Sequence, residues 1–376
     1  MSKKKQTVFV GLSGGVDSAV STVLLKKQGY EVVGVFIKTW HPDFLKCNEE
    51  EERHDAMRVA ASLDIPFLTF DFKDVYKKEV ADYMISEYRV GKTPNPDVMC
   101  NKEIKFGAFL KNALKMGADF VATGHYSQVK SISAQDDFFL GPRFSGSLSQ
   151  PDHSKKHFVP SLVKGADFSK DQSYFLWTLK QKQLSKIIFP VGHLKKTEVR
   201  KLAKKFNLPV AEKKDSQGIC FLGAIDLKEF LKHYIKEKKG KVLNEIGEKI
   251  GHHDGTVFHT LGERHGFTIT KKSPNDSRYY IIDKDMKKNI LIVSQNKNPS
   301  NFSLEIKNTN WIFKIPESNK IYTAQIRYHG EFLSCKIIRA KPNLARVIFT
   351  KPALVAPGQS CVIYDKNICL GGGIVK

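Results

Sequence analysis

Apolar residues in the first 125 positions follow two alternating patterns. Runs of strand length, rich in β-branched and aromatic residues, occur at residues 7–11, 31–38, 66–72 and 118–123. Between them, apolar residues recur at helical spacing over residues 16–28, 50–63, 75–88 and 104–116. Strands that alternate with helices predict an α/β fold with a doubly wound parallel sheet, in which ligands collect at the carboxyl ends of the strands.

The segment GKTPNPD at residues 91–97 interrupts this pattern with two prolines. Proline fixes its own φ and donates no backbone hydrogen bond, so it disfavours both a helix interior and a central strand. We therefore expect a shaped loop here, before the helix at 104–116.

The following residues predict a hairpin and two more helices. Residues 127–170 are polar and rich in Ser, Gly and Pro, which is typical of a hairpin with a long loop. Lys170 to Ser173 are expected to cap a short helix over 174–179, and residues 194–206 predict a strongly basic helix.

The pattern changes near residue 208, where we expect a domain boundary. A helix is predicted over 225–236, then a glycine-rich segment, and from 277 onward short β-rich runs alternate with turns. Such runs predict a small antiparallel barrel. A chain of 376 residues is long enough for three domains. We expect them at residues 1–207, 208–276 and 277–376.

A glycine-rich turn, GLSGGVDS at residues 11–18, joins the first predicted strand to the first helix. Gly14 and Gly15 have no Cβ, so their backbone N–H groups can approach an anion, and the helix start adds its positive dipole end. The turn has neither the lysine of a P-loop nor the spacing of a dinucleotide-binding loop. Without further information, a plain turn that closes a βα unit remains the alternative.

The charge of the chain favours a polyanionic partner. Its 61 Lys and Arg residues exceed its 39 Asp and Glu residues, a formal net charge of +22. Nucleic acid is the commonest such partner, although a proteome rich in lysine would produce the same excess. The apolar run at 8–12 is too short for a signal peptide core or a membrane span, so we expect a cytoplasmic protein with no membrane contact.

The six cysteines show no paired spacing of the kind that binds zinc, and we predict no protein-bound metal. Cys100 and Cys220 lie in polar, lysine-bearing segments where a thiolate would be stabilised, with Lys102 and Lys105 close to Cys100. Cys335, Cys361 and Cys369 lie on apolar strand patterns and are expected in the core. A nucleotide loop, two thiols and a basic surface suggest ATP-driven activation followed by sulfur chemistry on RNA.

Ser13 to Ser18, with the sequence SGGVDS, resemble the PP-loop of the ATP pyrophosphatases. Eight further strings, together with the PP-loop, resemble the bacterial tRNA-specific 2-thiouridylases, nearly end to end. These strings are TPNPDVMCNKEIKF, ATGHY, KDQSYFL, KKDSQGICF, HTLGERHG, IRY, PGQS and CLGGGIV, beginning at residues 93, 122, 170, 213, 259, 326, 357 and 369.

The resemblance implies an ATP site and a target-base site. ATP, with Mg²⁺, would lie on Gly11, Leu12, Ser13, Gly14, Gly15, Val16, Asp17 and Ser18, and Ile37 and Gly124 would frame the adenosine. Asn95, Pro96 and Asp97 would contact the target base, with Asp97 as general acid or base.

The resemblance also implies the sulfur chemistry and the tRNA contacts. Cys220 is similar to the cysteine that receives a persulfide from a sulfur-relay protein, and Cys100 to the partner that forms a disulfide with it on turnover. The substrate would be the wobble uridine of the tRNAs for Lys, Glu and Gln, bound by a monomer. Further tRNA contacts would come from His125, Lys170, Asp171, Gln172, Arg327, Tyr328 and Gln359.

Two departures from the family pattern affect RNA contacts. The segment between Tyr126 and Lys170 is longer than usual, and His265 stands where lysine is common.

Two other functions stay open. One is a PP-loop synthetase of the lysidine, arginosuccinate or GMP type, which needs no cysteine pair. The other is a non-catalytic tRNA-binding protein that uses ATP as a switch.

Overall fold

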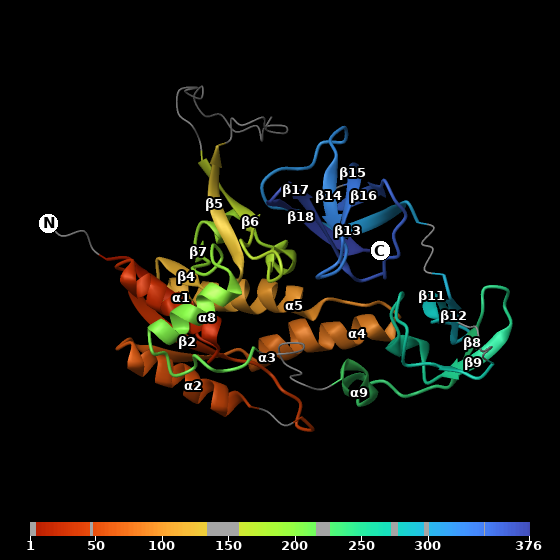
Figure 1. Cartoon of the computed structure of the whole chain (residues 1–376), viewed down its shortest axis with the longest axis horizontal. Helices are drawn as coiled ribbons and strands as arrows, with labels where there is room; N and C mark the ends of the chain where they lie inside the picture. Colours follow the sequence, from red (N-terminus) through yellow and green to blue (C-terminus); the bar gives the residue numbers. More distant parts are fainter. Residues whose placement is uncertain are drawn as a thin grey trace.

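The chain folds into an N-terminal parallel sheet with its helices, a central sheet and a C-terminal barrel (Figure 1). The computed structural model describes residues 5–45, 48–133, 158–215, 226–271, 277–296, 301–341 and 343–376. In the described part of the chain, no helix is long and apolar enough to cross a membrane.

The N-terminal sheet has five parallel strands in the order β3-β2-β1-β4-β7. The strands are β1 (Thr7–Gly11), β2 (Glu31–Lys38), β3 (Phe67–Asp71), β4 (Phe120–Ala122) and β7 (Ile187–Ile188). The first four confirm the predicted strands to within two residues at their starts and ends, whereas the two-residue β7 is too short for its periodicity to be recognised.

Helices cover both faces of this sheet, as predicted for a doubly wound fold. On one face α1 (Val16–Lys27), α2 (Glu49–Ser62) and α8 (Lys196–Lys205) share a core that includes Val20, Val59 and Val199. Two long helical segments form the other face. The first consists of α3 (Lys73–Tyr76), η1 (Lys77–Asp82) and α4 (Tyr83–Arg89), and the second of α5 (Pro96–Met99), η2 (Cys100–Phe109) and α6 (Leu110–Lys115).

The second of these segments corrects the prediction of a loop over residues 91–97. The helix begins at Pro96, eight residues earlier than expected, so Pro96 and Asp97 belong to its first turn. Proline is well suited to the first helical position because the N–H it lacks would have no intrahelical partner there. Asn95 caps this helix, and its side-chain oxygen accepts a hydrogen bond from the N–H of Val98 at 3.2 Å.

The predicted hairpin is formed by β5 (Ser127–Ser133) and β6 (Phe158–Lys164), which pair antiparallel. The helix predicted after Ser173 is a single 3-10 turn, Ser173–Leu176. The helix predicted over 225–236 is limited to α9 (Leu227–Lys232).

The central sheet has the order β10-β9-β8-β12-β11. Its strands are β8 (Gly240–Leu243), β9 (Lys249–His253), β10 (Thr268–Ile269), β11 (Tyr280–Asp285) and β12 (Ile290–Ser294). The last two strands were expected in the C-terminal barrel, and that expectation is wrong because β12 pairs with β8. Local alternation identifies a strand but does not specify its partner. The limits of the three domains stay a prediction.

The C-terminal barrel is antiparallel, as predicted. Its six strands are β13 (Ser303–Trp311), β14 (Tyr322–Gln325), β15 (Phe332–Lys341), β16 (Leu344–Phe349), β17 (Ser360–Asp365) and β18 (Ile368–Val375). Pairing of β13 with β18 closes the ring, and β18 also meets β6 at Ile368 and Val163. The hairpin of the N-terminal part therefore attaches to the barrel.

Candidate active site

The glycine loop lies at the carboxyl edge of the parallel sheet. Gly14 has φ +70°, and a Cβ there would lie 2.4 Å from the carbonyl oxygen of Glu52, so only glycine fits. The Ser18 hydroxyl closes the loop by donating to the carbonyl of Gly15 at 3.0 Å and accepting from the N–H of Ser13 at 3.3 Å. The loop therefore wraps the start of α1 in the shape expected of an anion site.

The end of β4 abuts this loop. A Cβ on Gly124 would lie 2.8 Å from the Ser18 nitrogen, so glycine allows strand and helix to approach closely. Ile37 lies near the end of the neighbouring β2 and is half-buried. Gly11, Ile37 and Gly124 thus lie at the ends of adjacent parallel strands, as predicted.

Asp17, in the first turn of α1, is held by two side chains from distant parts of the chain. Its Oδ1 accepts from the Tyr126 hydroxyl at 2.8 Å, and the Lys196 ammonium donates to Oδ1 at 2.7 Å and Oδ2 at 2.8 Å. Burial, and then the Asp17 charge, raise the pKa of the Tyr126 hydroxyl. Tyr126 is therefore a hydrogen-bond donor at neutral pH.

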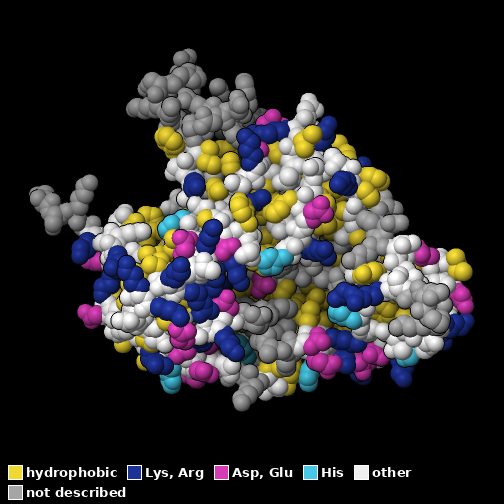
Figure 2. Space-filling view, viewed as in Figure 1, with side chains coloured by type: hydrophobic (Ala, Val, Ile, Leu, Met, Phe, Trp, Pro, Cys, Tyr) yellow, Lys and Arg dark blue, Asp and Glu magenta, His cyan; other side chains and the backbone are white. Residues whose placement is uncertain are grey.

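Lys196 also reaches a second carboxylate, 2.9 Å away on Asp215. Arg200 donates to the same Asp215 oxygen, and the Lys170 ammonium lies 3.8 Å from the other. Burial alone would raise the pKa of the Asp215 carboxyl, but Lys196 and Arg200 outweigh it and lower that pKa. Figure 2 shows Lys and Arg side chains gathered over the face formed by α1 and α8.

Lys170, Asp171 and Gln172, which were predicted to contact tRNA, each interact with a different part of the protein. The Asp171 carboxylate accepts from the N–H groups of Gly165 (2.9 Å) and Ser173 (3.1 Å) and from the Ser173 hydroxyl (2.9 Å). Burial raises the pKa of this carboxyl, although these bonds oppose the shift. Gln172 accepts from the N–H of Tyr126 at 2.9 Å. Both side chains fix the turn, and Lys170 reaches toward Asp215.

His125 is buried between aromatic rings. Its centroid lies 5.8 Å from those of both Phe106 and Phe189, and its Nδ1 lies 2.7 Å from the Thr123 hydroxyl. Burial, with a smaller contribution from Lys105, lowers the pKa of His125 well below its usual value. The imidazole is therefore neutral at physiological pH.

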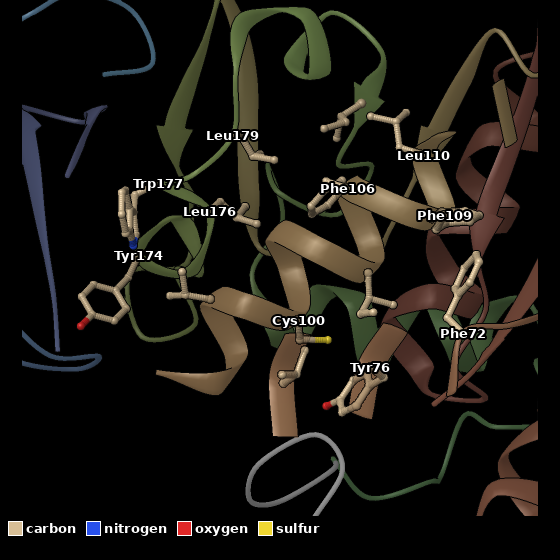
Figure 3. Close-up of a cluster of buried hydrophobic side chains, with 14 of the residues drawn as sticks. Phe72, Tyr76, Cys100, Phe106, Phe109, Leu110, Tyr174, Leu176, Trp177 and Leu179 are labelled. Atoms are coloured by element: carbon tan, nitrogen blue, oxygen red, sulfur yellow. The ribbon is translucent and has the colours of Figure 1, made fainter. Parts of the chain in front are cut away.

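Cys100 lies one turn into the helix that Pro96 begins, and it is 3% exposed. Figure 3 shows its sulfur within the apolar cluster, on the side of Tyr76. Lys102 forms an ion pair with Glu103 at 2.8 Å and lines a cavity beside the helix. That Lys102 and Lys105 favour a Cys100 thiolate stays a prediction. Cys220 lies outside the described residues.

The other described cysteines are core residues, as predicted. Cys335, Cys361 and Cys369 are fully buried. Burial raises the pKa of the Cys335 and Cys369 thiols to about 12 and that of the Cys361 thiol well above its usual value, so these three are protonated at neutral pH.

The helix that carries Asp97 and Cys100 presents two different faces. Asn95, Val98 and Lys102 line a cavity of about 360 Å³ between this helix and the barrel. Asp97 and Cys100 lie on the other side of the helix, because successive residues are rotated by 100°. That Asn95 and Asp97 contact the same base stays a prediction.

The barrel reaches this helix through the turn that contains Gln359. The Gln359 side chain donates to the carbonyl of Thr93 at 3.0 Å, and the Thr93 N–H donates to the carbonyl of Pro357 at 2.8 Å. Gly358, at φ +92°, lets this turn approach Thr93 closely. The C-terminal barrel thus supports the residues that precede Asn95.

Tyr328 packs against Phe175 with ring centroids 4.4 Å apart and the rings tilted by 46°, whereas its neighbour Arg327 is exposed. Burial, and then the charges of Asp171 and Asp97, raise the pKa of Tyr328 to about 12. Tyr328 therefore connects the barrel to the 170–176 segment close to Asp97.

Sequence analysis did not identify Lys196 and Tyr126, the two residues whose side chains bind Asp17. The basic helix that carries Lys196 was predicted, but nothing in the sequence distinguished Lys196 from the other five basic residues of that helix. Within the described residues, no group of three or more His, Cys, Asp or Glu side chains could hold a metal ion.

Comparison with known proteins covers nearly the whole chain. Residues 6–224 match the family model of a tRNA methyl transferase HUP domain, residues 228–295 a tRNA methyl transferase PRC-barrel domain, and residues 301–375 an aminomethyltransferase beta-barrel domain. The tRNA-specific 2-thiouridylase MnmA of Nitrosomonas eutropha is 42% identical over 379 residues, 99% of this chain and 98% of its own. The protein of the same name from Shouchella clausii is 42% identical over 384 residues, 100% of this chain and 98% of its own.

Similarity to solved structures is weaker. The U34-tRNA thiolase NcsA from Methanococcus maripaludis is 16% identical with a TM-score of 0.35, over 62% of this chain and 68% of its own. An NMN synthetase from Francisella tularensis is 17% identical with a TM-score of 0.33, over 56% of this chain and 67% of its own.

Proposed function

The chain belongs to the tRNA-specific 2-thiouridylase family, and from that membership we propose that it is a sulfurtransferase that converts the wobble uridine of tRNA to 2-thiouridine with ATP. The observation that carries this proposal is 42% identity to 2-thiouridylases along 99% of the chain. We further propose that the substrates are the tRNAs for Lys, Glu and Gln, and that a monomer in the cytoplasm binds them.

The first step would be activation of the uridine oxygen. The phosphates of ATP would lie on the loop from Gly11 to Ser18, with the adenosine between Ile37 and Gly124 and Mg²⁺ supplied with the nucleotide. The oxygen on carbon 2 would attack the α-phosphorus, and pyrophosphate would leave. The N–H proton at position 3 of the ring would pass to Asp97, acting as general base. A poor leaving group, oxygen, becomes part of AMP, a good one.

The second step would replace that oxygen with sulfur. The terminal sulfur of a Cys220 persulfide, supplied by a sulfur-relay protein, would attack carbon 2, and AMP would leave with the oxygen. The Cys100 thiolate would then attack the Cys220 sulfur, releasing 2-thiouridine and forming a Cys100–Cys220 disulfide. The nucleobase recovers its proton from Asp97, and a thiol reductant must reopen the disulfide before the next turnover.

The helix start at Asn95 and Pro96 suits a base that has left its stack. A uridine within an anticodon loop is reached by enzymes only after it is turned out of the stack. Asn95 fixes the first turn through Val98, and the barrel supports the preceding residues through Gln359 and Thr93. His125, Lys170, Asp171, Gln172, Arg327, Tyr328 and Gln359 remain the proposed tRNA-contacting set.

The products formed from ATP distinguish this proposal from its alternatives. Purified protein would be incubated with ATP, Mg²⁺, unmodified tRNA and a persulfide donor, and the nucleotides separated by chromatography. AMP and pyrophosphate are expected, whereas ADP and phosphate would indicate an ATP switch. A synthetase acting on another substrate would release AMP without needing tRNA or either cysteine.

A further inference from the structure

Helix α8 brings one lysine to the glycine loop that has none of its own. The ammonium of Lys196 lies 2.7 Å from Asp17 and 2.9 Å from Asp215, and its side chain is only 13% exposed. The helix is fixed behind the loop because its Val199 and Ala203 are fully buried in the core shared with α1. The fold therefore sets the position of Lys196.

The cluster around Lys196 balances the charges of its side chains. Lys196, Arg200 and Lys170 supply three cations, and Asp17, Asp215 and Asp167 supply three carboxylates, of which Asp167 accepts from the Lys196 N–H at 2.9 Å. The backbone N–H groups of the loop and the positive end of α1 add partial positive charge beside this balanced cluster. An anion at the loop is therefore favoured.

A purely structural ion pair between α1 and α8 would require only one carboxylate. Here two compete for one ammonium, and the side chains of Asp17 and Asp215 are 31% and 33% exposed. Asp215 has a second partner in Arg200 and would keep it if Lys196 moved away. Lys196 can therefore turn to a ligand without leaving Asp215 unpaired.

We propose that Lys196 is the phosphate-binding lysine of this loop: with ATP bound, its ammonium pairs with the β- and γ-phosphates in place of Asp215. A lysine at the phosphates does the same in P-loop proteins, where the loop itself carries it. The proposal rests on the ATP use proposed above.

The test compares ligands with and without the terminal phosphates. Dissociation constants for ATP, pyrophosphate and AMP would be measured by titration calorimetry for the wild type, Lys196→Gln, Lys196→Arg and the control Lys201→Gln. Lys201 is exposed on the same helix. We expect Lys196→Gln to weaken ATP and pyrophosphate binding about tenfold or more, because a charge-assisted hydrogen bond is lost, while AMP binding changes less than twofold. Lys196→Arg should recover part of the loss, and Lys201→Gln should match the wild type.

Unchanged ATP binding in Lys196→Gln would overturn the proposal, as would an equal loss for AMP and ATP, since the latter indicates a structural role. Asp215→Asn provides a second variant that keeps the lysine. By removing a competing carboxylate it should strengthen pyrophosphate binding, and weaker binding would contradict the proposal. Wild-type protein that binds ATP in this way but forms no 2-thiouridine would refute the proposed function and leave the role of Lys196 standing.

Discussion

The ammonium of Lys196 lies 2.7 Å from the carboxylate of Asp17, although the two residues are 179 positions apart in the chain. This contact links the first turn of α1 with the first turn of α8. It places a cation beside a glycine loop that lacks one, and so joins the most recognisable motif of the chain to its most basic helix.

The loop geometry predicts that Gly14→Ala weakens ATP binding. An alanine there would adopt a left-handed conformation, at a cost of about 1–2 kcal/mol, and its Cβ would also collide with the Glu52 carbonyl. We expect at least a tenfold loss of ATP affinity by calorimetry. Gly29→Ala is the matched control, since Gly29 has φ +91° with no atom within 4 Å of a Cβ. It should lose stability only, and equal ATP affinity in both variants would refute the steric argument.

The cysteine assignments predict that the two steps can be separated. Cys100→Ser should stop 2-thiouridine formation while tRNA-dependent release of pyrophosphate continues, because the hydroxyl cannot release the sulfur from Cys220. The measurement pairs a pyrophosphate assay with mass spectrometry of digested tRNA. Cys335→Ala alters a buried thiol remote from the proposed chemistry and should keep both activities. Normal thiolation by Cys100→Ser would remove Cys100 from the mechanism.

Lys170 and Asp171 should respond differently to substitution. Asp171→Ala would leave buried donors of Gly165 and Ser173 without an acceptor, at about 1–3 kcal/mol, and should lower the melting temperature by several degrees. Lys170→Ala should weaken tRNA binding and leave the melting temperature nearly unchanged. Calorimetric melting and a filter-binding assay check both. An unchanged melting temperature in Asp171→Ala would contradict the role of its carboxylate in holding this turn.

Buried histidines predict acid sensitivity of the central sheet. Burial, and then the nearby His259, lower the pKa of His253 from 6.5 to about 4. Below pH 6.5 the unfolded chain takes up a proton that the folded chain does not, so this stabilisation is complete above pH 6.5 and is lost as the pH falls toward 4. The loss is at most about 1.4 kcal/mol per pH unit. The free energy of unfolding, measured with denaturant, should depend less on pH in His253→Asn than in the wild type between pH 6.5 and 4. An identical pH dependence in the two proteins would contradict the assignment.

Local pattern predicted the parallel sheet because its strands and helices are each long enough to show their own period. It placed the loop from Gly11 to Ser18 at the correct edge of the sheet, because the loop follows β1 directly and the parallel strands of βαβ units all end at the same edge. The helix start at Pro96 was missed because proline disfavours a helix everywhere except its first turn. The partners of β11 and β12 were missed because strand pairing is a long-range property.

The candidate site was predicted in its motifs but not in its contacts. Asp17 was identified from its loop, whereas Lys196 and Tyr126 come from segments whose approach to the loop depends on the whole fold. Asp171 and Gln172 have polar side chains that could bind either RNA or their own turn, and sequence does not distinguish the two.

The most direct test of the proposed function is the formation of 2-thiouridine by the purified protein. Wild type and Cys220→Ser would each be incubated with ATP, Mg²⁺, unmodified tRNA and a persulfide donor, and the tRNA digested for mass spectrometry. Wild type should form 2-thiouridine at the wobble position with release of AMP and pyrophosphate, and Cys220→Ser should form none. Absence of 2-thiouridine with the wild type, or full thiolation by Cys220→Ser, would contradict the account.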